Sequence, residues 1–201
     1  VWINDEHHLT HAACAFYNSG FDKAAILIID GAGSLQTHYI DKQQQIQGYE
    51  CESIWIAKYP GEFKSLYKTY GTNASIRICF KEHNFDNAVT LAKAYEGVTE
   101  YLGWRAIEGG KTMGLAPYGD NEKYNNIFDK VVTTGGEIDI VKMDMSYFTW
   151  HTSDNDMFND KLIDLIGFPP RFKDEPIEQH HKDLAASLQR WYEAALYFII
   201  N

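Results

Sequence analysis

The stretch HHLTHAACAFYNSGFDKAAILIIDGAG, residues 7–33, decides the fold of the chain and holds most of its chemistry. Residues 6–18 are predicted to form a helix, because Asp5 is a suitable N-cap and an Asn-Ser-Gly stop signal follows. The apolar run over residues 24–30 predicts a buried strand that ends at Asp30 and enters a glycine turn. The sequence thus predicts a helix, a strand and a turn in direct succession.

Two histidines of the predicted helix, His7 and His11, are four residues apart and therefore project from the same face, whereas His8 points elsewhere. Imidazoles bind Zn, Fe and Ni, and one added carboxylate gives the ligand pattern of non-haem Fe(II). Asp30 lies at the carboxyl end of a strand, where α/β folds place ligand contacts. Two interpretations stay open: a metal site made of His7, His11 and Asp30, or a polar helix start that exposes its histidines to water.

The predicted turn after the strand contains Gly31 and Gly33 on either side of a small residue. Such a turn can present consecutive backbone N–H groups to an anion, for example a phosphate. The alternative is an ordinary hairpin turn that reverses the chain between two strands.

Two basic residues are further candidates for anion binding. Lys111 closes a Gly-Lys-Thr run, but a P-loop requires a glycine five residues before Gly110, and Arg105 stands there. The P-loop is therefore excluded, and Lys111 either pairs with a phosphate or carboxylate or is a solvated lysine. Arg171 follows two prolines, so it either clamps an anion from a stiff backbone or is a surface arginine.

Composition narrows the class of protein. The chain has 201 residues, of which 45% are hydrophobic and 14% aromatic, as expected of a folded globular protein. Its net charge of −10 argues against a nucleic-acid binder with a broad basic surface. Three scattered cysteines favour a reducing cytoplasm, and no apolar run approaches the ~20 residues that span a bilayer.

The rest of the chain is expected to combine an antiparallel meander with helices. QTHYID and GYECESIWIAK, at residues 36–41 and 48–58, complete the predicted meander. Helical segments are expected from residue 62 onward, first EFKSLYKTYG and then FDNAVTLAKAYEGVTEYLGW. The run from 108 to 119 is expected to be irregular because it is rich in glycine. An apolar stripe that includes Leu184 and Leu188 predicts a final helix.

The motifs together resemble a known family. HHLTHAA with its spacing to Asp30-Gly31-Ala32-Gly33, EGGKTMGLAPYG, and GFPPRFKDEPIEQHHKDLAASLQ resemble the nodulation-protein and cephamycin-type O-carbamoyltransferases. The resemblance runs from end to end of the chain, and GKTMGLAPYG is its most specific segment. The His-x3-His element is less specific, since it recurs in the related family that makes threonylcarbamoyladenosine in tRNA.

The resemblance implies an α/β fold of the actin/sugar-kinase/Hsp70-like (ribonuclease H-like) ATPase class, incomplete in this chain. Residues 1–20 would be the end of a first lobe, including its metal-binding helix. Residues 21–201 would belong to the second lobe, with an insertion at 120–175.

The resemblance also implies an activity, the ATP-dependent transfer of a carbamoyl group from carbamoyl phosphate, through a carbamoyl-adenylate, to a hydroxyl of a small-molecule or glycan acceptor. By matching position, the metal ligands would be His7, His11 and Asp30, with iron the favoured ion and Zn or Mg as alternatives. Gly31 and Gly33 would let the backbone approach bound ATP or carbamoyl-adenylate, and Lys111 and Arg171 are the further candidates for contact with this cofactor. The resemblance identifies no catalytic residue.

The chain departs from the family in two ways. Ser34 stands where the family commonly has Glu. A first lobe and a C-terminal adenylate-forming domain are also missing, and the chain opens without Met and ends without a helix stop signal. We therefore expect a fragment that is inactive alone. The alternatives are a tRNA threonylcarbamoyl-transfer relative, which the acidic balance disfavours, and a non-catalytic metal- or nucleotide-binding module.

Overall fold

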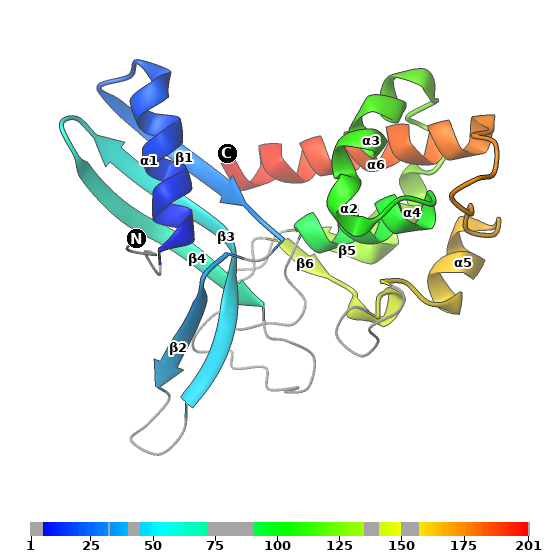
Figure 1. The fold of residues 1–201 in the computed structure, drawn as a ribbon, viewed down its shortest axis with the longest axis horizontal. Helices are drawn as coiled ribbons and strands as arrows, with labels where there is room; N and C mark the ends of the chain where they lie inside the picture. The colour runs from blue at the N-terminus through cyan, green and yellow to red at the C-terminus, as the bar shows by residue number, and fades with distance from the viewer. Residues whose placement is uncertain are drawn as a thin grey trace. The chain divides into compact units, whose positions relative to one another are not determined.

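The computed structural model shows a mixed α/β protein whose chain forms two compact units, Val1–Thr90 and Leu91–Asn201 (Figure 1). The structure describes residues 6–31, 33–39, 45–71, 91–134, 141–149 and 157–200. Within these ranges, every helix is too short or too polar to cross a lipid bilayer. The actin-like ATPase class, the lobe boundary after residue 20 and the insertion at 120–175 stay predictions.

The first unit is one helix packed on an antiparallel sheet. Its elements are α1 (His7–Ser19), β1 (Lys23–Ile29), β2 (Leu35–Tyr39), β3 (Gln45–Lys58) and β4 (Glu62–Gly71). Figure 1 shows α1 lying across the sheet, and a cluster of apolar side chains fills the space between them. That core consists of Ala12, Phe16, Ile26, Ile28, Trp55 and Ala57. The predicted first helix and first strand are confirmed, but the N-cap position of α1 is Glu6 and not the predicted Asp5.

The hairpin turn that we considered at the two glycines is wrong. Both β1 and β2 pair antiparallel with β3 on the same edge, with Ile29 opposite Glu52 and Leu35 opposite Tyr49. The two strands therefore run in the same direction, and the sheet edge is interrupted between Ile29 and Leu35. A pattern of apolar residues shows where a strand ends but not whether the chain reverses there. The 14-residue strand β3 is long enough to pair with both.

The predicted helix at residues 62–71 is also wrong, because this segment forms β4. Phe63, Leu66, Tyr67 and Tyr70 match helical spacing, which explains the misleading pattern. The preceding turn brings the segment against the free edge of β3, where it pairs from Glu62 to Gly71. Pairing with a neighbouring strand outweighs the local helical pattern.

The second unit is mainly helical. Its elements are α2 (Leu91–Tyr101), η1 (Ala106–Glu108), α3 (Gly109–Leu115), η2 (Ala116–Tyr118), α4 (Asn125–Val131), β5 (Val132–Thr134), β6 (Val141–Met143), η3 (Met145–Tyr147), α5 (Asp160–Ile166) and α6 (Gln179–Ile200). The predicted final helix is confirmed as α6, whose buried face includes Leu184 and Leu188 and packs against α2, α3, α4 and η2. The helix predicted in residues 85–104 is confirmed over α2, while 85–90 lie outside the described residues.

The glycine-rich run that we expected to be irregular is instead helical through η1, α3 and η2. Tertiary packing stabilises this helical run despite the low helix propensity of its glycines. Thr112 is buried, and its hydroxyl lies 2.9 Å from that of Thr99. The run ends at Gly119, where an added Cβ would lie only 2.0 Å from the carbonyl oxygen of Lys182 in α6. Gly119 therefore allows two backbones to approach closely.

Substitution of Gly119 by alanine should destabilise the second unit by at least about 1–3 kcal/mol, because the new methyl group overlaps the α6 backbone. Gly114→Ala is the matched control, since a Cβ there meets nothing within 4 Å. Unfolding in urea measures both. Equal midpoints for the two variants would contradict the close approach of η2 and α6.

Candidate metal centre

The three predicted ligands lie together in the first unit. His7 Nε2 is 2.6 Å from Asp30 Oδ2 and 2.9 Å from His11 Nε2, and His11 Nε2 is 3.9 Å from Asp30 Oδ2. The structure thus gathers one nitrogen from each histidine and one carboxylate oxygen within 4.8 Å of one another. Whether this cluster holds a metal stays a prediction.

Two elements build the cluster. His7 and His11 lie one turn apart at the start of α1, and Asp30 is the first residue after β1. The Asp30 N–H donates to the Cys51 carbonyl at 2.8 Å, so the ladder of β1 and β3 continues one residue further and fixes the aspartate. Because α1 packs on β1, the helix start and the strand end meet.

The arrangement of the three atoms favours a cation. A ring nitrogen carries either a proton or a lone pair, so His7 Nε2 cannot donate to Asp30 and accept from His11 at once. Hydrogen bonds among His7 Nε2, His11 Nε2 and Asp30 Oδ2 therefore require all three atoms to share one proton. A divalent ion accepts a lone pair from each of them, and this nitrogen and oxygen donor set fits Fe or Zn.

The spacing and exposure of the cluster also fit an ion. Ligand atoms about 2.1 Å from one ion lie about 3.0 Å apart in octahedral and about 3.4 Å apart in tetrahedral geometry. The observed separations of 2.6, 2.9 and 3.9 Å bracket both values. The side chains of His7, His11 and Asp30 are 45%, 54% and 30% exposed, which leaves room for further ligands.

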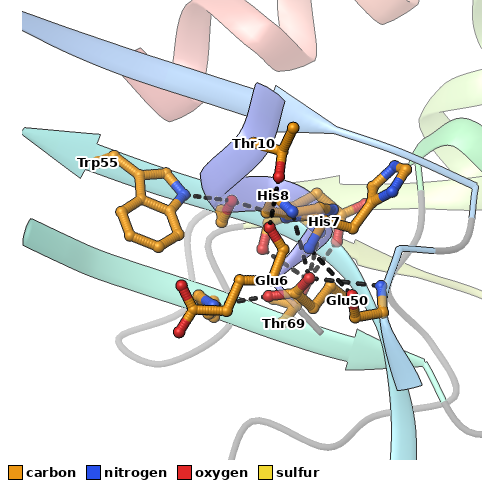
Figure 2. Close-up of polar contacts among 11 residues, drawn as sticks. Glu6, His7, His8, Thr10, Glu50, Trp55 and Thr69 are labelled. Carbon is orange, nitrogen blue, oxygen red and sulfur yellow. Dashed lines mark hydrogen bonds and ion pairs between the residues drawn. The ribbon is translucent and has the colours of Figure 1, made fainter. Parts of the chain in front are cut away.

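His8 points away from the cluster, as predicted, and is fully buried. Its Nδ1 lies 2.7 Å from the Ser53 hydroxyl, which also accepts a hydrogen bond from the indole N–H of Trp55 (Figure 2). Burial lowers the pKa of His8 to about 4, against an opposing effect of the Glu50 carboxylate, so the ring is neutral at neutral pH. His8 therefore adds no positive charge beside a cation.

The predicted phosphate-binding glycines lie at the break between β1 and β2. Gly33 is packed tightly from the inside, because an added Cβ would lie 2.9 Å from both the Glu50 Cβ and the His8 ring. Its N–H donates to the Glu50 carbonyl at 2.7 Å. The structure thus explains Gly33 by close packing, while phosphate binding at Gly31 and Gly33 stays a prediction.

Lys111 and Arg171 belong to the second unit. The Lys111 ammonium lies 2.7 Å from the Glu108 carboxylate and is half exposed. The interpretation of Arg171 as a surface residue is wrong, because it is 6% exposed. Its guanidinium donates to the backbone carbonyls of Leu102, Phe172, Lys173 and Glu175. Cofactor binding by either residue stays a prediction.

Sequence reasoning missed the residues that support the cluster. Ser34, at the position where the resemblance leads one to expect Glu, accepts the His7 N–H at 2.9 Å. Glu50 is fully buried in β3 and forms an ion pair with Lys68 on β4 at 2.6 Å. An acidic residue within the apolar strand segment YECESIWIA was the available signal, since buried charges are rare without a partner.

Comparison with known proteins gives consistent matches. The family model described as "Carbamoyltransferase N-terminus" matches residues 2–199. An uncharacterized protein of Synechocystis sp. is 31% identical over 186 residues, which cover 92% of this chain and 25% of that protein. Nodulation protein NolNO of Sinorhizobium fredii is 27% identical over 97% of this chain and 22% of its own length. Nodulation protein NolO of Bradyrhizobium diazoefficiens is 28% identical over 97% and 28%.

The alignments cover very different shares of this chain and of its relatives. The alignments cover nearly all of this chain, yet the chain spans only about a quarter of the length of these relatives.

The metal assignment predicts that His7→Ala, His11→Ala and Asp30→Asn each reduce bound metal at least about tenfold, because each removes one of three ligands. Elemental analysis of the purified full-length protein measures this. His180→Ala is the control, since its ring lies beside Glu178 in the second unit and outside the cluster. Unchanged metal content in the three cluster variants would refute the assignment.

Proposed function

The chain belongs to the carbamoyltransferase N-terminal family, and we propose that it is part of an enzyme that transfers a carbamoyl group from carbamoyl phosphate to a hydroxyl acceptor with the consumption of ATP. The acceptor is a small molecule or a glycan. The remaining parts of the active enzyme are a first lobe and a C-terminal adenylate-forming domain of the same polypeptide.

The proposed reaction has three steps. Water first releases phosphate from carbamoyl phosphate and leaves carbamate. A carbamate oxygen then attacks the α-phosphorus of ATP, forming carbamoyl-adenylate and releasing pyrophosphate. The acceptor oxygen finally attacks the carbamoyl carbon, AMP leaves, and the acceptor proton passes to a base that the described residues do not identify.

The proposed roles of the residues follow from their chemistry. His7, His11 and Asp30 hold one divalent ion, with iron favoured by the two-histidine, one-carboxylate set. Such an ion neutralises phosphate charge and polarises the group under attack. The backbone at Gly31 and Gly33 lies beside this ion and faces the nucleotide phosphates in the proposed complex, although the Gly33 N–H itself donates to the Glu50 carbonyl.

The observation that carries this proposal is the convergence of the three ligand atoms next to the glycine-containing break of the sheet edge. A cation beside this break suits an anionic substrate. The acidic balance of the chain, with a net charge of −10, disfavours the tRNA-modifying alternative.

Incubation of the full-length protein with ATP, radiolabelled carbamoyl phosphate and a panel of hydroxyl acceptors should release pyrophosphate and label one acceptor. His7→Ala should slow pyrophosphate release at least about tenfold through loss of the ion, and His180→Ala should leave it unchanged. A full-length protein that binds metal and ATP but forms neither carbamoyl-adenylate nor labelled product would instead be a non-catalytic binding module.

A further inference from the structure

The first turn of α1 has an unusual cap. The N-terminal N–H groups of a helix need acceptors from outside the helix, and Glu6, at the N-cap position, supplies none from its side chain. The His7 N–H donates to the Ser34 hydroxyl at 2.9 Å, and the His8 N–H faces Glu50 Oε2 at 3.3 Å. Residues 27 and 42 positions further along the chain thus cap the helix.

Glu50 also holds the segment that follows Asp30. The Ser34 N–H faces the same oxygen, Glu50 Oε2, at 3.4 Å. The Glu50 backbone adds two hydrogen bonds. Its carbonyl accepts from the Gly33 N–H at 2.7 Å, and its N–H donates to the Ser34 backbone carbonyl at 3.1 Å. Figure 2 shows Glu50 next to His7 and His8 at the start of α1. One residue of β3 is therefore bonded to both segments that carry the metal ligands.

Glu50 carries a buried charge, and burying a charge costs free energy unless it is paired. Its side chain is 0% exposed, and Lys68 Nζ lies 2.6 Å from Oε1. Lys68 in turn lies 4.8 Å from the centre of the Trp55 ring. A buried ion pair is often no more stable than apolar residues of the same size. Stability alone therefore does not explain the carboxylate, whereas two backbone N–H groups near a helix N-terminus require such an acceptor.

We infer that Glu50 is a positioning residue of the metal centre: its buried carboxylate fixes the start of α1 and the segment after Asp30 relative to each other. This inference rests on the proposed metal centre. Glu50 itself is not a ligand, because the described cluster consists of His7, His11 and Asp30. Its effect passes through the backbone, and a small displacement of either segment separates the ligand atoms.

Glu52 provides a matched control on the same strand. It is also an acidic residue, 3% exposed, and lies two positions from Glu50. A register shift between Glu50 and Ser53 interrupts the alternation of side chains, so Glu52, which is opposite Ile29 and adjacent to Ser53, points to the face of β3 away from α1. The Thr69 hydroxyl on β4 donates to its carboxylate, and its own N–H donates to the Thr69 oxygen at 2.9 Å. Removal of this carboxylate disturbs β3 and β4 rather than the start of α1.

The test is a titration of the metal-free full-length protein with Co²⁺, followed by calorimetry and by the visible absorption of the bound ion, which reports coordination geometry. We expect Glu50→Ala to weaken Co²⁺ binding about 10–100-fold and to change the absorption bands, as supporting residues of metal sites do. Glu52→Ala should change the affinity less than about twofold. Urea unfolding identifies conditions under which every variant is folded.

Two further variants keep the test decisive if Glu50→Ala does not fold. Ser34→Ala removes only the acceptor of the His7 N–H and should weaken Co²⁺ binding several-fold. Glu50→Gln keeps an acceptor oxygen and should retain a higher Co²⁺ affinity than Glu50→Ala. If Glu50→Ala does not fold, Glu50→Leu replaces it in this comparison.

The possible outcomes separate the two hypotheses. If the wild-type protein binds no Co²⁺, both the metal centre and this inference are wrong. If it binds Co²⁺ and the Glu50 and Ser34 variants bind it equally well, or if Glu52→Ala is as harmful as Glu50→Ala, only the positioning role is wrong and the proposed function stands.

Discussion

The pairing of one long strand with two shorter strands on the same edge is the constraint on which the first unit depends. Because β1 and β2 both run antiparallel to β3, the chain cannot turn back between them and has to break the edge. The break places Asp30 and Gly33 beside the start of α1. The same geometry that interrupts the sheet therefore brings a carboxylate to two histidines, and no separate loop is needed to build the candidate site.

The candidate site has an exposed layer and a buried layer. The exposed layer is the set of His7, His11 and Asp30, whose side chains are partly open to solvent. The buried layer contains Glu50 with its ion pair to Lys68, and the neutral His8 bonded to Ser53. Reactive groups need access, whereas the groups that orient them need fixed surroundings, and the sheet separates these two requirements.

Much of the candidate site, but less of the sheet, could be predicted from the sequence. Helical spacing predicted that His7 and His11 share a face, and the end of the apolar run marked Asp30. The strand β4 was missed because its apolar residues fit a helix equally well, and only the edge of β3 decides between the two. Glu50 was missed because its partners are distant in sequence. Non-local pairing is the information that a local pattern lacks.

The distance in sequence between the ligands has a thermodynamic consequence. His7 and Asp30 are 23 residues apart and belong to a helix and to a sheet edge. A cation bound by both would be a reversible cross-link between the helix and the sheet of the unit. By mass action, each tenfold increase of free ion above its dissociation constant adds about 1.4 kcal/mol to the stability of the folded unit. If the proposed ion is bound, the concentration of free metal therefore changes the stability of the folded unit as well as the charge of the site.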